Sequence, residues 1–286
     1  TSGATPFVSA LAALIFSINP DFTPAEVKDI IKSTADDIYH IPYNQEYQGL
    51  LGTGRINAFR AVKTAKCMVD YENGIDYGMR DTLEDYFEEP NTNNTDVFWH
   101  SPDIFVRNQP DGRIIQVHEN PEFGETTPSY VYVRVFNNGC ESIMAENNKV
   151  KLYWAKANTS LSWPEHWDGT LTMPNGNGEQ VVMGGQIGEV MMPPLYPGES
   201  KLIEIPWIPP NPAIYEGVTP NPWHFCLLAR IDFSADPMTF PASGSLGNDI
   251  KNNNNIVMKN TTVVDLKTNS ANPEPVGGVI AIGNSK

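Results

Sequence analysis

The first residues of the chain place a serine in front of an apolar helix. The run from Thr1 to Pro6 reads Thr-Ser-Gly-Ala-Thr-Pro, and Pro6 has the fixed φ that suits the first turn of a helix. Residues 7–18 are apolar at nearly every position, which is typical of a helix buried inside a sizeable domain. The free backbone N–H groups at the start of such a helix stabilise a developing oxyanion. The pattern therefore makes Ser2 a candidate nucleophile for acyl transfer.

The motif around Ser2 resembles the active-site serine motif of the subtilisin-like serine proteases, Gly-Thr-Ser-Met-Ala-(Ser/Thr)-Pro-His-Val. The segment from Asn19 to Lys28 continues as that family does after this helix. The segment from Gly52 to Ala58 matches Gly-x-Gly-x-(Val/Ile)-(Asn/Asp)-Ala, which closes the catalytic domain. The resemblance covers about residues 1–66 and implies that Ser2 is the catalytic serine of an α/β protease domain.

Two departures from the family motif lie beside Ser2. Gly3 stands where the family usually has Met, and Phe7 stands where it has His, so both bear on the substrate pocket. A Thr-Ser-Gly run before an apolar helix is, taken alone, usually an N-cap. Three matches in the right order and at the right spacing favour the catalytic interpretation.

A serine hydroxyl is inert without a base that removes its proton and a third group that orients the base. In the family the Asp, the His and the asparagine of the oxyanion site all come before the serine, so here they would precede Thr1. None of the five histidines lies in a recognisable acid–base motif: His40, His100, His118, His166 and His224. We therefore expect a serine endopeptidase in the intact protein and an inactive chain on its own.

The charge and the lengths of the apolar runs exclude two classes of binding partner, nucleic acids and the interior of a membrane. The net charge is −15, from 34 acidic and 19 basic residues, so a nucleic acid would be repelled. No apolar run approaches the ~20 residues of a membrane-spanning helix. The resemblance implies a protein or peptide substrate and a secreted or cell-surface location. Cys67, Cys140 and Cys226 are odd in number and widely spaced, and they indicate neither a disulfide framework nor a metal site.

The predicted fold class is α+β and multidomain. Residues 1–66 would be the helical C-terminal remnant of a subtilisin-like α/β domain. Its second helix would run from Pro24 to about Ala35, with Thr23 as N-cap and Glu26 completing a capping box. Residues 36–51 are predicted to be a surface connection, and residues 57–66 a final short helix. Residues 67–94 are rich in Asp and Glu and are predicted to be an acidic linker or a strap along the surface.

Residues 95–268 are predicted to form an antiparallel β-sandwich of immunoglobulin-like type. Short runs of alternating apolar and polar residues, separated by Gly, Pro and Asn, predict eight strands and no helix between them. These runs are 104–106, 114–117, 130–136, 150–154, 181–183, 201–205, 225–231 and 255–265. Residues 269–286 are predicted to be a tail, with one further strand at 279–282.

Two weaker signals lie in the β region. Five tryptophans could form a sugar-stacking platform, although core packing is the simpler interpretation: Trp154, Trp163, Trp167, Trp207 and Trp223. A group of oxygen-bearing side chains makes calcium a candidate ligand, although Asn and Asp are also ordinary turn residues: Asp232, Asp236, Asn248, Asp249 and Asn252 to Asn255. No cofactor is otherwise indicated.

Two function classes remain open at this stage. The first is a subtilisin-like endopeptidase that acts through Ser2, and the second is a secreted binding or adhesion module whose protease remnant is only structural. Under both interpretations the apolar first helix requires a partner that covers it. Five of its side chains, Phe7, Leu11, Leu14, Ile15 and Ile18, are too many for one short amphipathic helix to cover. We therefore expect a partner, either an N-terminal fragment carrying the Asp and His or a second copy of this chain.

Overall fold

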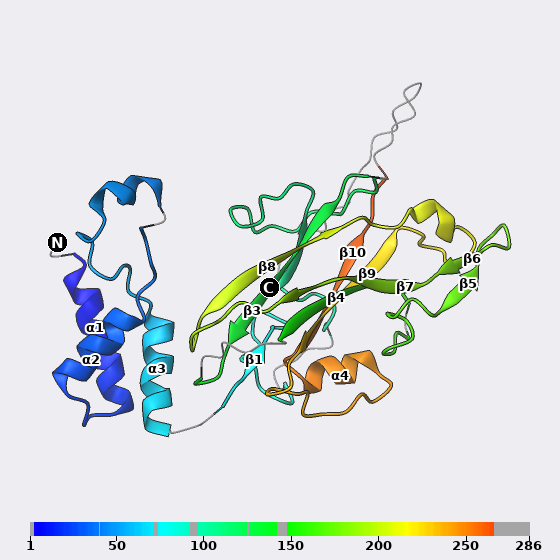
Figure 1. Cartoon of the computed structure of the whole chain (residues 1–286). Coiled ribbons are helices and arrows are strands. Elements are labelled where there is room, and N and C mark those ends of the chain that lie inside the picture. The colour runs from blue at the N-terminus through cyan, green and yellow to red at the C-terminus, as the bar shows by residue number, and fades with distance from the viewer. Residues whose placement is uncertain are drawn as a thin grey trace, which may run out of the picture.

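The computed structural model describes residues 3–39, 41–70, 74–91, 97–124, 126–141, 148–158 and 160–265. Three N-terminal helices lie beside a larger body of antiparallel sheets, and α3 is the helix nearest to the sheets (Figure 1). The predicted tail and its strand at 279–282 lie outside the described residues. Within the described ranges, no helix is both long enough and apolar enough to cross a bilayer.

The helical region, residues 3–70, contains α1 (Thr5–Ile18), α2 (Pro24–Ser33), the 3₁₀ helix η1 (Pro42–Tyr47) and α3 (Ala58–Asp70). The predicted capping box of α2 is confirmed. Thr23 Oγ1 accepts from the Glu26 N–H at 3.3 Å, while the Glu26 carboxylate accepts from the Thr23 N–H at 2.7 Å. The last helix begins where the sequence predicts but extends four residues further, to Asp70.

The helices share a small apolar core. Its buried members come from all three helices and the first turn: Leu11, Ile15, Phe22, Val27, Ile30, Ala61 and Ala65. The two ends of the connection between α2 and α3 are joined by an isolated antiparallel bridge between Asp36 and Arg55. Each backbone N–H donates to the other residue's carbonyl oxygen, at 2.8 and 3.0 Å. Gly54 makes the bridge feasible, because its φ is +126° and a Cβ there would lie 2.0 Å from the Asp36 carbonyl oxygen.

Two four-stranded antiparallel sheets form the β region, residues 74–265. In the first, the central strand pairs with one long strand along one edge and two short strands along the other: β3 (Ser129–Asn137), β8 (Ser200–Trp207), β2 (Ile104–Arg107) and β1 (Tyr77–Gly78). In the second, the order is β10 (Ile256–Thr262), β9 (His224–Asp232), β4 (Lys149–Lys156) and β7 (Gly184–Met191). A separate hairpin joins β5 (Thr172–Pro174) to β6 (Gln180–Val182).

The facing sides of the two sheets form one core, to which β2, β3 and β8 contribute from one sheet and β4, β9 and β10 from the other. A second core lies on the outer face of the second sheet. There Tyr153, Leu228 and Ile256 are covered by Trp167 and by Leu246 of α4 (Leu246–Asn252). Strands β4, β9 and β10 of the second sheet are therefore buried on both faces, whereas its edge strand β7 is largely exposed. The sequence did not predict α4, because seven residues with two asparagines carry little helical periodicity.

Six of the eight predicted strands are confirmed in place, and residues 181–183 overlap the short β6. The strand predicted at 114–117 is wrong, since Ile114 is 87 % exposed in a loop. The Arg107 guanidinium determines this loop, because it pairs with the carboxylates of Asp111 and Glu119 at 2.8 and 2.7 Å. β7 was missed because its Gly-Gly-Gln-Ile-Gly run has low strand propensity.

The described part of the acidic segment, residues 74–91, lies against the sheets. Tyr77 pairs in β1 with Asn137, and both Tyr77 and Met79 are buried in the sandwich core. Arg80 donates to both carboxylate oxygens of Asp103, at 3.0 and 2.7 Å. The sequence left two alternatives open for this segment, an acidic linker and a strap along the surface. Its described part is anchored by two apolar side chains among the acidic ones.

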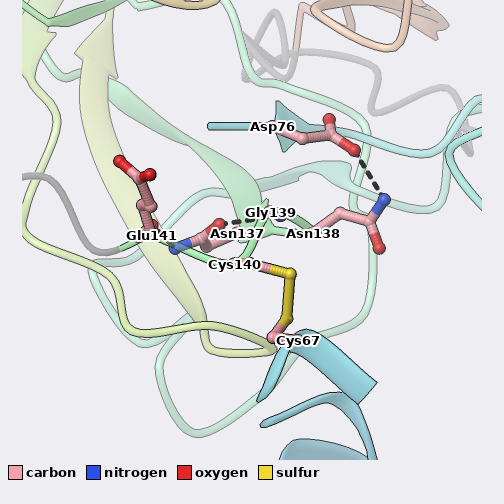
Figure 2. The surroundings of a disulfide bond; sticks show 7 residues. All are labelled: Cys67, Asp76, Asn137, Asn138, Gly139, Cys140 and Glu141. Atoms are coloured by element: carbon pink, nitrogen blue, oxygen red, sulfur yellow. Dashed lines mark hydrogen bonds between the residues drawn. A yellow bond between two sulfur atoms is a disulfide. The ribbon is translucent and has the colours of Figure 1, made fainter. Parts of the chain in front are cut away.

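A disulfide joins the helical region to the β region. Cys67 of α3 bonds to Cys140, which follows β3, and the two are 73 residues apart in sequence (Figure 2). Asn138 Nδ2 donates to Asp76 Oδ2 at 2.6 Å beside it, which fixes the loop that carries Cys140. The inference that the cysteines show no disulfide framework is therefore wrong for this pair. Cys226, the third cysteine, is free and buried.

Candidate functional site

Ser2 lies outside the described residues, so the structure gives only its immediate surroundings. The described chain starts at Gly3, and α1 begins at Thr5 with Pro6 in its first turn. The cap residue of α1 is Ala4, and no side chain of the described residues caps this end or places an acid in its first turn. The first N–H groups of this 14-residue helix therefore have no side-chain acceptor among the described residues. This is the polarity that an oxyanion site needs.

The face of α1 turned away from the other helices is exposed and apolar. Leu11 and Ile15 are buried against α2 and α3, whereas Phe7 is 70 % exposed and Leu14 is 51 % exposed. Burying apolar area stabilises by roughly 25 cal/mol per Å², so leaving these side chains in water forgoes that stabilisation. We expected that the chain could not cover all apolar side chains of its first helix, and the exposure of Phe7 and Leu14 agrees with this expectation.

The four described histidines are dispersed, and His40 lies outside the described residues. None of the four forms a hydrogen bond or ion pair with an Asp or Glu side chain in the part of the chain that the structure describes. His166 Nδ1 lies 3.1 Å from Ser162 Oγ, but that hydroxyl donates to Glu165 at 2.6 Å. The carboxylate therefore contacts the serine and not the histidine, which is not the order of a catalytic triad.

His118 is a buried structural acceptor. Its Nδ1 accepts from the Val106 N–H at 3.1 Å, and burial, assisted by the charge of Lys259, lowers the pKa of His118 to about 4. An unfolded histidine titrates near 6.5, so between pH 6.5 and 4 the unfolded chain binds the extra proton. The free energy of unfolding contributed by His118 is therefore fully present above pH 6.5 and is lost as the pH falls toward 4.

We expect His118→Asn to flatten this dependence, because the asparagine oxygen can accept from Val106 without titrating. The parent should lose about 3 kcal/mol more than the variant between pH 6.5 and 4. Urea unfolding across that range measures the difference. The raised pKa values of Asp81 and Asp236, both about 6, act in the opposite direction but are common to both proteins. His166→Asn is the control, and equal slopes in the parent and His118→Asn would contradict the assignment.

The residues considered for calcium do not converge on one point. Asp232 pairs with Lys151 at 2.5 Å, and Asp249 accepts from the Ser243 N–H at 2.7 Å. Asp236 accepts from the Tyr77 N–H at 2.7 Å, and burial raises the pKa of Asp236 to about 6. The described residues contain no group of three or more His, Cys, Asp and Glu that could hold a metal ion.

The asparagine run has a structural use instead. Asn254 and Asn255 donate to Asp76 and to the Tyr77 carbonyl, at 2.7 and 2.9 Å. These bonds join the start of β10 to β1.

The five tryptophans do not form one platform. Trp167 and Trp207 are buried, Trp154 packs on the sandwich core, and Trp223 is 49 % exposed at the start of β9. Trp163 is covered by the Arg230 guanidinium, 4.0 Å above its ring. A sugar ring would therefore find at most one open indole face among them.

A family model matches the helical part of the chain. Residues 1–66 match the Subtilase family. A "Calcium-dependent protease" of Trichormus variabilis is 44 % identical over 68 residues, which cover 23 % of this chain and 10 % of that protein. The "Serine protease AprX" of Bacillus subtilis is 40 % identical over 62 residues, covering 22 % of this chain and 13 % of that protein. The chain thus spans about a tenth of the length of the curated relatives it matches.

Among solved structures, the CARDB domain of a Pyrococcus furiosus protein, crystallised with di-metal ions, aligns with 57 % of this chain and 94 % of that domain. The identity is 16 % and the TM-score is 0.28.

Proposed function

We propose that this chain is the part of a subtilisin-like serine endopeptidase that carries the nucleophile, Ser2. One observation carries the proposal: a Thr-Ser-Gly-Ala-Thr-Pro motif runs into the first turn of α1, whose start has no side-chain cap, within a segment that matches the Subtilase family. The substrates are peptide bonds of proteins, and the reaction is acyl transfer followed by hydrolysis.

In this reaction Ser2 Oγ attacks the peptide carbonyl carbon while a histidine outside this chain takes the hydroxyl proton. That histidine then protonates the leaving amine as the C–N bond breaks, which leaves an ester on Ser2. Water, deprotonated by the same histidine, cleaves the ester and restores Ser2. The N–H groups at the start of α1 supply part of the charge stabilisation for both tetrahedral intermediates.

The partner in this proposal is an N-terminal fragment of the catalytic domain that carries the Asp and the His. The exposed apolar face of α1, with Phe7 and Leu14, supports it, because helices apolar on every side belong in the interior of a domain. Self-association through the same face is the competing arrangement.

The β region is proposed to be a separate immunoglobulin-like domain. The strand orders β8-β3-β2 and β10-β9-β4-β7 support this, as do the crossings between the two sheets after β3 and after β7. We place its start directly after α3, because β1 already belongs to the first sheet. A secreted or cell-surface location is supported by the Cys67–Cys140 disulfide, since disulfides persist in oxidising compartments.

The test is covalent labelling of Ser2 by a fluorophosphonate probe. We expect no labelling of the chain alone, because the base is missing, and labelling after co-refolding with an N-terminal fragment that carries the Asp and His. Ser9→Ala removes another serine, exposed on α1, and should leave the labelling unchanged. Stoichiometric labelling of Ser2 in the isolated chain, or a stable complex that is never labelled, would contradict the proposal.

A further inference from the structure

A pocket of about 400 Å³ lies on the outer face of the second sheet, and no residue of α1 lines it. Side chains from neighbouring positions of β4 and β9 form its floor, since Lys151 and Arg230 face each other in the strand register. Trp163 and the segment that includes Pro237 and Met238 form its walls. Its volume lies in the range of small-ligand sites.

Arg230 is the unusual member of this pocket. Four other arginines, Arg55, Arg60, Arg80 and Arg107, each pair with a carboxylate. Arg230 is partly buried and forms no ion pair with any described residue. Its single hydrogen bond goes to the weak acceptor Met238 Sδ, at 3.3 Å. Burial lowers the pKa of Arg230, while the nearby charges of Asp249 and Asp232 act in the opposite direction without forming an ion pair with it.

The described neighbours of Arg230 orient its guanidinium but offer it no carboxylate or carbonyl acceptor. Its guanidinium stacks 4.0 Å above the Trp163 ring, and Trp163 also contacts Tyr153 edge-on, with ring centroids 5.0 Å apart. The Tyr153 hydroxyl lines the same pocket and has no hydrogen-bond partner among the described residues. Lys151 forms an ion pair with Asp232. The three charges of Lys151, Asp232 and Arg230 therefore sum to +1, in a chain whose net charge is −15.

We propose that this pocket binds the carboxylate of a peptide, with the Arg230 guanidinium and the Tyr153 hydroxyl as donors and Trp163 and Met238 as the apolar wall. A stacked guanidinium presents parallel N–H groups that match the two oxygens of a carboxylate. The apolar wall takes the side chain next to that carboxylate. The choice of a peptide over other carboxylates rests on the proposed function, since peptide hydrolysis releases new C-terminal carboxylates.

NMR titration of the full chain tests the proposal through the indole N–H signal of Trp163, which Trp163→Phe identifies. The probes are N-acetyl-Ala-Leu with a free carboxylate, its C-terminal amide, and N-acetyl-Glu-amide, which places the carboxylate on a side chain. We expect saturable shifts with the free acid and a dissociation constant at least about tenfold higher for the dipeptide amide. The N-acetyl-Glu-amide arm separates a terminal from a side-chain carboxylate as the natural source.

Arg230→Gln should weaken binding of the free acid at least about tenfold, and Tyr153→Phe should weaken it less. Arg134→Gln is the matched control, because Arg134 lies on β3 of the other sheet and donates to Gln116. If Arg230→Gln does not fold, the affinity of Tyr153→Phe for the free acid still tests the proposal. Equal affinity for acid and amide, unchanged binding by both pocket variants, or binding of glucuronate but not of either peptide acid would overturn the proposal.

The titration does not involve Ser2. A protease that is active but does not bind the peptide acid contradicts only the pocket. Binding in a chain whose Ser2 is never labelled leaves the pocket standing and contradicts only the protease.

Discussion

Replacing Ser2 with alanine in the assembled protease is expected to lower kcat by about a millionfold. That magnitude comes from nucleophile substitutions in subtilisin, which this segment resembles. Without the hydroxyl no ester can form, and the remaining catalysis comes from the oxyanion site and substrate binding alone. KM should change by less than about threefold, because alanine leaves the substrate-binding surfaces in place. Steady-state hydrolysis of a chromogenic peptide by the complex with the N-terminal fragment measures both parameters.

The control for this substitution is Ser9→Ala, which replaces an exposed serine within α1 and should retain the parent kcat. A second control follows from the Ser162–His166 contact in the β region. Ser162→Ala should also leave kcat unchanged, since Glu165 already accepts the proton of that hydroxyl. If Ser2→Ala retained activity while Ser162→Ala lost it, the nucleophile would lie in the β region.

The features that were predictable from the sequence are those determined by neighbouring residues. The Thr23–Glu26 capping box depends on four consecutive positions, and the strand at Ser129–Asn137 is a single run rich in β-branched and aromatic residues. The candidate nucleophile, Ser2, also rests on a contiguous motif and stays a prediction. In each case the physical cause lies within one helical turn or one strand.

The features that were missed depend on contacts between distant residues. The partner of Cys67 lies 73 positions away, and nothing in that spacing distinguishes a bond from chance. The outer face of the second sheet looks polar at Lys151 and Arg230, so its cover by α4 and Trp167 was not predictable from strand alternation. Arg230 became a candidate binding residue only when the structure showed that no carboxylate of the described residues pairs with it.

The last prediction concerns the Cys67–Cys140 disulfide, which joins a small helical core to a large β core. Seven buried residues make up the helical core, and a unit of that size is only marginally stable by itself. Closing a loop of 73 residues lowers the entropy of the unfolded chain, which corresponds to about 4 kcal/mol of stability. Gly198 of the β region also lies close to Phe59 and Arg60 of α3, so packing accompanies the disulfide at this junction.

We therefore expect the double variant Cys67→Ser/Cys140→Ser to lose the cooperative unfolding of its two parts. All six tryptophans lie between residues 99 and 223, so fluorescence reports the β region, whereas ellipticity at 222 nm is dominated by the helices. In guanidinium chloride the two transitions should coincide in the parent, and in the variant the ellipticity should fall at lower denaturant. Reducing the parent with dithiothreitol should reproduce the variant. Cys226→Ser, which keeps the donor to Asn260, should not. Coincident transitions at the parental midpoint in the double variant would show that packing alone holds α3 to the sheets.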